Sequence, residues 1–327
     1  MNEEKIRNLL FKGKEISLKT IKTLSERGYL PTDFSVRTIK RWERTFIGQF
    51  VMSYPKETHK LLQVERAIGR KPEIFDFTED NLSKVVVAIK ADNAPNTAKQ
   101  IASQVKTTIT RVLELNDGAV SVPCKRYNKI LSLDGTPTTK TYMNIDDVKA
   151  FLKYEPTTTI EKVCHARFAV MLMTGARYSD VCNFNKSNIQ DGVLTFVPQK
   201  TKTSGTVVSV PVSETTIKFI EILSEGRGKY ALSQFNSTLR DICRKCGLNE
   251  EVTYFAAGKY VTKPKYEAMR SHLGRASFVT NMLKMGQQMH EVSKLAGHTD
   301  IAMTSRYNAS TDVKLTEKAN DFINMKF

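Results

Sequence analysis

Cysteine and long apolar segments are scarce in this sequence of 327 residues. Its five cysteines are odd in number and scattered, which argues against a disulfide framework. Cys243 and Cys246 form a lone CxxC pair with no second pair at zinc spacing, so we interpret them as ordinary helix cysteines. The longest apolar run, residues 168–173, is far too short to cross a membrane. No secretory-leader pattern opens the sequence, and we expect a cytoplasmic protein with reduced thiols and no membrane partner.

Acidic residues are too few to balance the basic ones. The chain has 34 Asp and Glu against 50 Lys and Arg, which gives a net charge of +16. A surplus of this size favours a polyanionic partner, because each neutralised phosphate releases counterions. Apolar residues at 40% and charged residues at 26% are typical of a folded globular chain and exclude a disordered one. Charge therefore favours nucleic acid as the partner without distinguishing DNA from RNA.

The N-terminal part of the chain is predicted to be helical and basic. The length exceeds that of a usual single domain, so we expect two domains, the first over residues 1–135. Apolar periodicity predicts helices in this part at residues 35–50, 56–68, 81–89 and 97–115. The pattern leaves open whether the first 50 or so residues form a separate module. A solvated side chain explains any single charge here, but the total charge favours phosphate contact by the basic face as a whole.

A linker and a change of period mark the start of the second domain. Residues 116–141 lose helical periodicity and contain two Asp-Gly pairs and two prolines, which predicts a linker. The second domain is expected over residues 142–327. Within it, residues 193–197 and 207–211 alternate like strands, and the polar segment 199–205 between them suits the tip of a hairpin.

The rest of the second domain is predicted to be mainly helical. A strongly apolar helix is expected over residues 160–174, stopped by Gly175 and followed at once by Arg177. Residues 254–263 are ambiguous and fit a second small hairpin, and a short amphipathic tail helix is expected over 313–327. The predicted fold class is therefore mainly α, with an α+β second domain that carries a small antiparallel sheet.

The stretch from Ser271 to Asn308 contains several side chains that could bind an anion or act in catalysis. His272 and Arg275 are three residues apart and share one face of a predicted helix. A second short helix is expected to end at Gly297, so that His298 follows a helix stop. Two basic side chains and a following phenol suggest a site for an anion and a nucleophile.

Cleavage of a phosphodiester without a metal needs a protein nucleophile, fixed cations and a proton donor. Arginine suits the charge on the two non-bridging oxygens, because its planar fork is always charged. Tyr307 could serve as the nucleophile. His298 and Tyr307 are nine residues apart, which places them on opposite faces of a continuous helix. They can face one phosphate only if the backbone breaks between them, and Thr299 and Asp300 offer caps for such a break.

Four motifs give the chain a resemblance to the tyrosine recombinase (phage integrase) family: TGARYSD at 174–180, KTSG at 202–205, SHLGRASFVTN at 271–281 and AGHTDIAMTSRY at 296–307. The third motif looks most like the integrases of Bacteroides-type mobile elements. The resemblance implies a site-specific DNA recombinase with a helical core-binding domain and a catalytic domain. It further implies double-stranded DNA as partner, a homo-tetramer on paired sites (monomer or dimer off DNA), accessory DNA-bending factors and a nucleoid-associated location.

The resemblance also assigns roles to six side chains: Arg177, Lys202, His272, Arg275, His298 and Tyr307. Tyr307 would attack the scissile phosphate and form a 3′-phosphotyrosine. The two arginines would clamp that phosphate, and His298 would donate to a non-bridging oxygen. A 5′-hydroxyl from a partner strand would then reverse the link. Because the bond energy is retained in the phosphotyrosine, neither ATP nor a metal cofactor is expected.

Proton transfer would fall to the remaining two side chains. Lys202 would protonate the leaving 5′-oxygen, and His272 would assist proton transfer from Tyr307. Lys200 competes with Lys202 for the first role, and the following Thr-Ser-Gly favours Lys202. Asp180 is interpreted as a partner of Arg177 or a helix cap and not as a catalyst.

Two other functions remain as alternatives. A type IB topoisomerase would use the same nucleophile and cations as a monomer without strand exchange. A DNA-binding regulator on an inactivated recombinase scaffold is disfavoured, because all six side chains are retained. The chain departs from the family's commoner residues at Ala176, Gly274, Ala276 and Ala296, which we interpret as packing positions.

Overall fold

The computed structural model describes residues 3–11, 14, 16–136, 141–225, 230–256, 259–305 and 307. The chain divides into two compact units, Met1–Pro137 and Thr138–Phe327. Each unit has its own hydrophobic core. The tail helix expected over residues 313–327 lies outside the described residues.

Four short helices open the first unit: α1 (Glu3–Leu10), α2 (Leu18–Glu26), α3 (Val36–Glu43) and α4 (Phe46–Ser53). Ser17 and Ser35 cap α2 and α3 by accepting a hydrogen bond from a backbone N–H of the first turn. The single helix predicted over residues 35–50 is wrong. Thr45 accepts from the N–H of Gly48 at 3.0 Å and so starts α4 as a separate helix.

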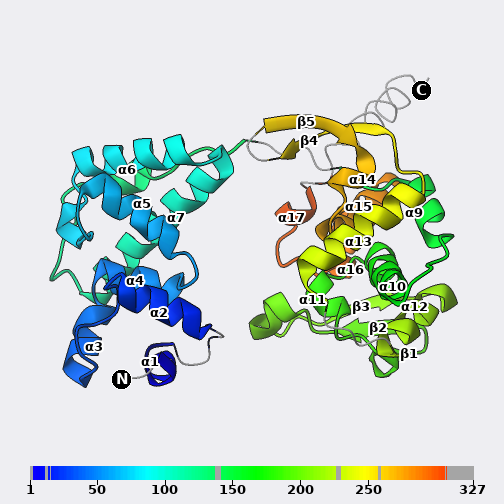
Figure 1. Ribbon diagram of the computed structural model, residues 1–327, viewed down its shortest axis with the longest axis horizontal. Helices are drawn as coiled ribbons and strands as arrows, with labels where there is room; N and C mark the ends of the chain where they lie inside the picture. The colour runs from blue at the N-terminus through cyan, green and yellow to red at the C-terminus, as the bar shows by residue number, and fades with distance from the viewer. Residues whose placement is uncertain are drawn as a thin grey trace, which may run out of the picture. The chain divides into compact units, whose positions relative to one another are not determined.

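The rest of the first unit is built on longer helices: α5 (Thr58–Ile68), η1 (Ile74–Asp76), α6 (Glu79–Asp92), α7 (Pro95–Leu115) and α8 (Tyr127–Ile130). In Figure 1 α6 lies beside both α5 and α7. Pro95 occupies the first position of α7, where its missing N–H costs no helical hydrogen bond. The buried residues of this unit form one hydrophobic cluster, whose first and last members in the sequence are Ile6 and Leu131. The first 50 residues therefore share one core with the longer helices.

The segment predicted as a linker mostly belongs to the first unit. Cys124, Tyr127 and Leu131 are buried in its core, and the N–H of Cys124 donates to the carbonyl of Phe77 at 3.2 Å. The linker prediction was therefore wrong for this part of residues 116–141. The reason is that α8 has only four residues, too few to show a helical period in the sequence.

The second unit is organised around the buried helix α10 (Thr159–Thr174). It contacts α9 (Ile145–Leu152), α12 (Glu214–Glu225), α13 (Leu232–Lys245) and α15 (His272–Lys284), and lies among them in Figure 1. Most of its residues are buried on every face, as expected of a helix without a polar side. Gly175 ends α10 with φ +68°, a conformation that favours glycine.

Both ends of α10 are fixed, and the N-terminal end is held by a carboxylate. Glu161 accepts hydrogen bonds from Lys245 Nζ at 2.5 Å, from the backbone N–H of Thr157 at 2.9 Å and from Tyr154 Oη at 3.1 Å. The Lys245 and Thr157 hydrogen bonds lower the pKa of Glu161 to about 2. The carboxylate therefore ties α10 to α13.

A three-stranded antiparallel sheet has the order β1 (Ile189–Gln190), β2 (Val193–Phe196), β3 (Val208–Pro211). Strands β2 and β3 were predicted, whereas β1 was missed because two residues carry no alternation. Asp191 and Gly192, both with positive φ, form the tight turn between β1 and β2. The polar segment predicted at the tip of the hairpin does connect the antiparallel strands β2 and β3, and it folds into a 3-10 helix, η3 (Gln199–Ser204).

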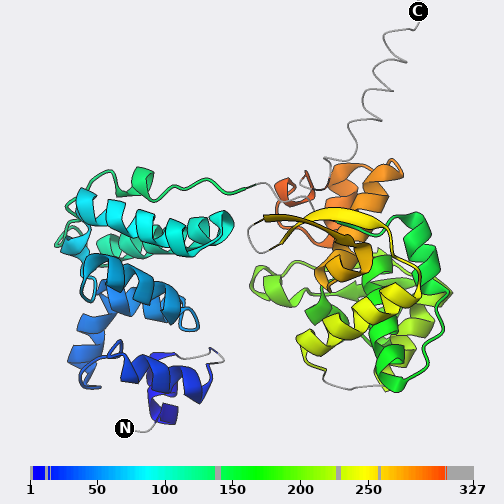
Figure 2. The ribbon, with the colours of Figure 1, turned by 45° about the horizontal axis from the view of Figure 1, so that its top comes forward.

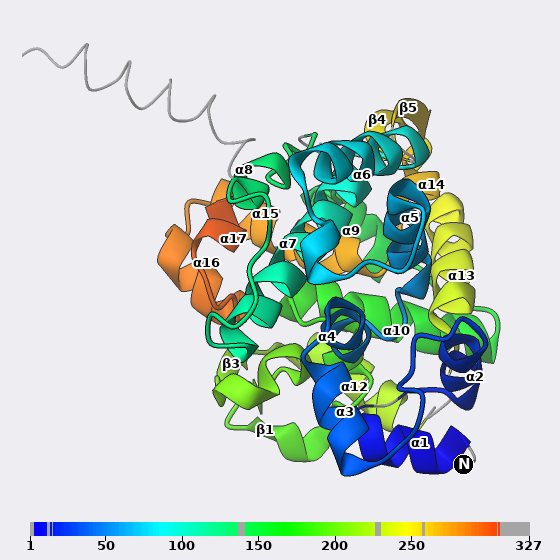
Figure 3. The same ribbon diagram turned by 90° about the vertical axis from the view of Figure 1, so that its left-hand side faces the viewer.

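The remaining elements complete the second unit: α11 (Tyr178–Val181), η2 (Lys186–Asn188), β4 (Glu251–Ala256), β5 (Lys259–Pro264), α14 (Lys265–Ala268), α16 (Met289–Ala296) and α17 (Ala302–Ser305). The hairpin suggested for residues 254–263 is present as β4 and β5, which run side by side in Figure 2. Helices α15, α16 and α17 follow one another in space as in sequence (Figure 3). The predicted fold class, mainly helical with small antiparallel sheets, is confirmed.

Candidate active site

Arg275 is held inside the second unit by the close packing of α15 on α10. A Cβ added to Gly274 would come within 2.8 Å of Met171 Cβ, so only glycine allows this approach of the two helices. Arg275 is 4% exposed, and its Nη1 donates to the carbonyl of Gly175 at 3.0 Å and to that of Ala296. These bonds tie the guanidinium to the ends of α10 and α16. Its Nη2 is buried and has no hydrogen-bond partner among the described residues.

Arg177 follows the end of α10 by three residues and caps the N-terminus of α11. The Nη1 atom of its guanidinium is buried and, within the described parts of the chain, unpaired. Each of the two arginines thus buries at least one N–H donor that has no acceptor among the described residues. Because an unmade buried hydrogen bond is costly, such donors indicate a site prepared for an external acceptor.

The two guanidinium groups are close enough to repel each other. Burial, and then the charge of Arg177, lower the pKa of Arg275 to about 10, against smaller opposing effects of Tyr307 and Asp180. Two neighbouring guanidinium groups are stabilised by an anion that accepts hydrogen bonds from both of them. The electrostatics therefore favour a dianionic or monoanionic oxygen ligand such as a phosphodiester.

The two carboxylate oxygens of Asp180 differ in their hydrogen bonding. Its Oδ1 accepts from the N–H of Gln199 at 2.9 Å, the first residue of η3, and so ties that helix to α11. Its Oδ2 is buried and has no partner in the described ranges. Of the two readings left open by the sequence, helix capping is the one for which the structure has a hydrogen bond.

His298 and Tyr307 are brought together by the predicted backbone break. Helix α16 ends at Ala296, Gly297 takes φ +62°, and α17 begins only at Ala302. Asp300 Oδ1 caps this start by accepting from the N–H of Ala302 at 2.9 Å. The rings of His298 and Tyr307 stack with centroids 6.3 Å apart. Tyr307 is 9% exposed and packs against the core of the unit.

Lys202 and His272 occupy exposed positions. Lys202 lies in η3, between strands β2 and β3. His272 is the first residue of α15, one turn before the buried Arg275. Arg177 and Tyr307 thus both lie close enough to Arg275 to affect its pKa, and the ring of His298 stacks with that of Tyr307. The two proton-transfer candidates lie at exposed positions.

One residue beside this site was not singled out from the sequence, and another, Gly274, was interpreted only as a packing position. Thr304 Oγ1 lies 2.7 Å from His298 Nδ1, a contact across six residues that no periodic pattern would have found. Gly274 stands inside a predicted helix, and a glycine there is the signal that could have revealed the close contact with α10.

Three cysteines of the second unit are shielded from solvent. Cys243 is buried on α13 and Cys246, the C-cap residue of that helix, is half-buried, and burial raises the pKa of Cys246 to about 11 and that of Cys164 to about 12. Such thiols stay protonated at neutral pH. Among the described residues, no group of three or more His, Cys, Asp or Glu is placed to hold a metal ion. Nor does any helix in the described ranges have the length and hydrophobicity to span a membrane.

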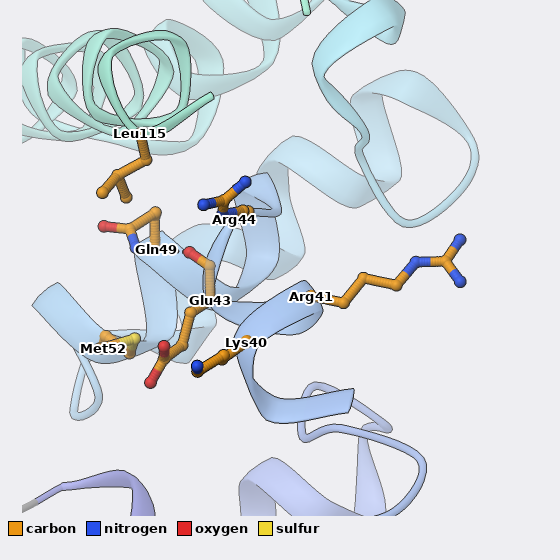
Figure 4. A pocket seen from close by; sticks show the side chains of 7 residues that line it. All are labelled: Lys40, Arg41, Glu43, Arg44, Gln49, Met52 and Leu115. Carbon is orange, nitrogen blue, oxygen red and sulfur yellow. Dashed lines mark hydrogen bonds between the residues drawn. The ribbon is translucent and has the colours of Figure 1, made fainter. Parts of the chain in front are cut away.

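The first unit contains a basic cavity of about 700 Å³, lined by Lys40, Arg41, Glu43, Arg44, Gln49, Met52 and Leu115. The charged lining residues, three basic and one acidic, all come from α3 and its C-cap, whereas α4 and the end of α7 contribute uncharged side chains. In Figure 4 the side chain of Arg41 extends away from the other lining residues. The lining matches the basic face predicted for the N-terminal part.

Three solved structures resemble the chain in fold. One is the Tn1549 transposon integrase in complex with a circular intermediate DNA, with TM-score 0.57, 13% identity, and coverage of 84% of this chain and 99% of that one. A lambda integrase dimer bound to a COC′ core site gives TM-score 0.52, 15% identity and coverage of 88% and 91%. A lambda integrase tetramer bound to a Holliday junction gives TM-score 0.50, 14% identity and coverage of 91% and 85%. No curated protein matches the sequence.

The family profile described as "Phage integrase family" matches residues 141–314, which is more than half of the chain. The match contains Arg177, Arg275, His298 and Tyr307 and the elements that position them. The chain therefore belongs to the phage integrase family, the tyrosine recombinases.

Proposed function

We propose that the protein is a site-specific DNA recombinase that breaks and rejoins strands through a 3′-phosphotyrosine, in integration or excision of a mobile element or phage. The observation that carries this proposal is a pair of buried guanidinium nitrogens. Arg177 Nη1 and Arg275 Nη2 are both buried without a hydrogen-bond partner among the described residues, and Tyr307 lies close enough to Arg275 to affect its pKa. A scissile phosphate would supply the missing acceptors. That the element is of the Bacteroides type stays a prediction from the third motif.

The chemistry follows from these positions. Tyr307 Oη attacks phosphorus and the P–O5′ bond breaks. The downstream part of the strand leaves with a 5′-hydroxyl, and the upstream part stays joined to the tyrosine through its 3′-phosphate. The negative charge on the non-bridging oxygens is met by the two guanidinium groups and by His298. Attack by a 5′-hydroxyl from a partner strand reverses each bond change and releases Tyr307. Because one phosphate ester replaces another, the exchange needs no external energy source.

Lys202 and His272 are proposed to move the protons. Lys202 would give a proton to the departing 5′-oxygen, and His272 would assist removal of the proton from Tyr307. Both residues lie at exposed positions of the second unit. Catalytic hydrogen bonds are often completed only when substrate is bound.

The two units are proposed to share the DNA duplex. Residues 142–327 would hold the scissile phosphate, and residues 1–135 would act as a core-binding domain through the basic cavity beside Lys40 and Arg44. The solved relatives support this assignment, since the Tn1549 and lambda integrases are bound to DNA and one lambda structure is a tetramer on a Holliday junction. We propose four copies acting on two sites, with DNA-bending accessory factors.

Trapping on a nicked suicide substrate tests the proposal. The nick lets the short 5′-hydroxyl fragment diffuse away, so the covalent protein–DNA adduct accumulates. Wild-type protein should form an adduct that migrates slowly in a denaturing gel, and Tyr307→Phe should form none while binding the same DNA. The proposal is wrong if wild-type protein forms no adduct on any candidate attachment site. Relaxation of a supercoiled plasmid without any such site would instead support the topoisomerase alternative.

A further inference from the structure

Thr304 is connected to both His298 and Tyr307 by hydrogen bonds. Its side-chain Oγ1 lies 2.7 Å from His298 Nδ1, and its backbone carbonyl accepts from the N–H of Tyr307 at 3.0 Å. The Thr304 side chain is 0% exposed, so water does not compete for its hydroxyl. None of the six roles assigned above uses this residue.

The direction of this hydrogen bond and the tautomer of His298 are linked, because the Thr304 hydroxyl can donate to a bare Nδ1 or accept from Nδ1–H. A neutral imidazole has one N–H donor and one acceptor nitrogen. If Thr304 donates to Nδ1, the proton must sit on Nε2, which can then donate to a phosphate oxygen. The opposite tautomer would present the Nε2 lone pair to an anion, which is repulsive.

We infer that Thr304 is a positioning residue that holds His298 in the Nε2–H tautomer and fixes its ring relative to Tyr307. This inference rests on the proposed role of His298 as a donor to the scissile phosphate. It adds a residue that acts through His298 and does not touch the substrate.

The turn between α16 and α17 brings the Thr304 hydroxyl close to His298. Gly297 reverses the chain with φ +62°, and the single turn of α17 turns Thr304 back toward the histidine. The neighbouring Ser305 differs, because its Oγ donates to the carbonyl of Ala302 at 2.9 Å on its own helix. Ser305 is exposed. It therefore offers a matched control, a hydroxyl one residue away that does not contact His298 in the described geometry.

The kinetic test compares Thr304→Val, Thr304→Ser and Ser305→Ala by single-turnover adduct formation on the suicide substrate. Val keeps the shape of Thr and removes the hydroxyl. We expect Thr304→Val to slow adduct formation about tenfold, the effect of losing one neutral hydrogen bond. Thr304→Ser should stay within about twofold of wild type, and Ser305→Ala should not change the rate. DNA affinity should be unchanged in all three.

A spectroscopic test reports on the tautomer without any DNA. The chain has five histidines, so ¹⁵N labelling of histidine gives a simple NMR spectrum, in which His298→Gln identifies the signals of His298. In wild type and Thr304→Ser, Nε2 should have the shift of a protonated nitrogen and Nδ1 that of an acceptor. In Thr304→Val both shifts should move toward the average of a tautomer mixture.

The inference is overturned if Thr304→Val forms the adduct as fast as wild type, or if Thr304→Ser is as slow as Thr304→Val. It is also overturned if the ¹⁵N shifts of His298 do not change when the hydroxyl is removed. Should Thr304→Val fail to fold, Thr304→Ser against Thr304→Ala isolates the hydroxyl in the same way. If wild-type protein forms no adduct, the proposed function fails, and the NMR comparison still decides the role of Thr304.

Discussion

The rings of His298 and Tyr307 lie within 6° of parallel, at a centroid distance of 6.3 Å. The histidine thus packs on the proposed nucleophile while its Nδ1 is engaged by Thr304. Under the proposed mechanism, a side chain in this position would affect the reaction in two ways, by donating to the phosphate and by supporting the tyrosine ring.

Substitution of His298 separates these two contributions. His298→Ala removes both the donor and the ring, and we expect adduct formation to fall by about 10²-fold or more, as for loss of one oxyanion donor. His298→Gln retains an N–H donor of similar reach and should lose less. Single-turnover rates at saturating DNA provide the measurement. Equal rates for His298→Ala and wild type would show that His298 does not contact the transition state.

The arginine pair predicts that simple anions stabilise the free protein. At neutral pH the charged form of Arg275 is penalised, since its pKa is lowered to about 10 in the folded state, and this penalty is relieved only as pH rises above that value. A sulfate ion bound between the guanidinium groups should offset the penalty. We expect sulfate to raise the Tm of wild type more than chloride does at equal ionic strength.

The control for this anion effect is an exposed arginine of the same unit. Arg177→Gln should abolish the sulfate-specific increase in Tm, whereas Arg244→Gln on α13 should retain it. A sulfate response that survives Arg177→Gln would place the anion elsewhere on this basic protein.

The carboxylate of Glu161 predicts a pH-dependent part of the stability. Its pKa is lowered to about 2 by its hydrogen bonds, so its contribution is complete above the ordinary value of 4.5 and disappears as pH falls toward 2. We expect Glu161→Gln to reduce the free energy of unfolding by about 2 kcal/mol at pH 7. This value is smaller than the pKa change alone would give, because Lys245 is partly exposed and water weakens the pair. Urea unfolding at pH 7 and pH 3 should show the difference shrinking at the lower pH. A constant difference would assign the effect to packing.

The sequence predicted the helical architecture and the break after Gly297, because helix stops and apolar periods are local. It did not predict the burial of Arg275 next to an exposed His272, since a spacing of three residues places both on one helix face without telling what covers that face. Thr304 was missed for a related reason. Its partner His298 is six residues away across an irregular turn, and only the folded backbone brings the two together.

The basic cavity of the first unit predicts contacts with phosphates and not with bases. Lys40→Gln and Arg44→Gln should each weaken DNA binding to a similar extent on specific and unrelated duplexes, and lower the salt slope of log K by about one. Fluorescence anisotropy over a series of salt concentrations measures both quantities. Gln63→Ala, a change in the same unit away from the cavity lining, serves as the uncharged control. A loss confined to the specific site would instead indicate base recognition by these residues.

The backbone conformation at Gly297 is predicted to affect both the stability of the protein and the rate of adduct formation. With φ +62°, an added Cβ is strained and would also come within 2.6 Å of Val208 Cγ2 on β3. Gly247 has φ +83° and nothing within 4 Å of an added Cβ, so it isolates the backbone effect. We expect Gly247→Ala to cost about 1 kcal/mol of unfolding free energy, and Gly297→Ala to cost a further 1 kcal/mol or more from the clash, by order of magnitude. Because His298 is the next residue, Gly297→Ala should also slow adduct formation at a temperature where it remains folded, whereas Gly247→Ala should not. Equal stability losses and equal rates for the two variants would mean that β3 yields at Val208 and that the turn does not position the histidine.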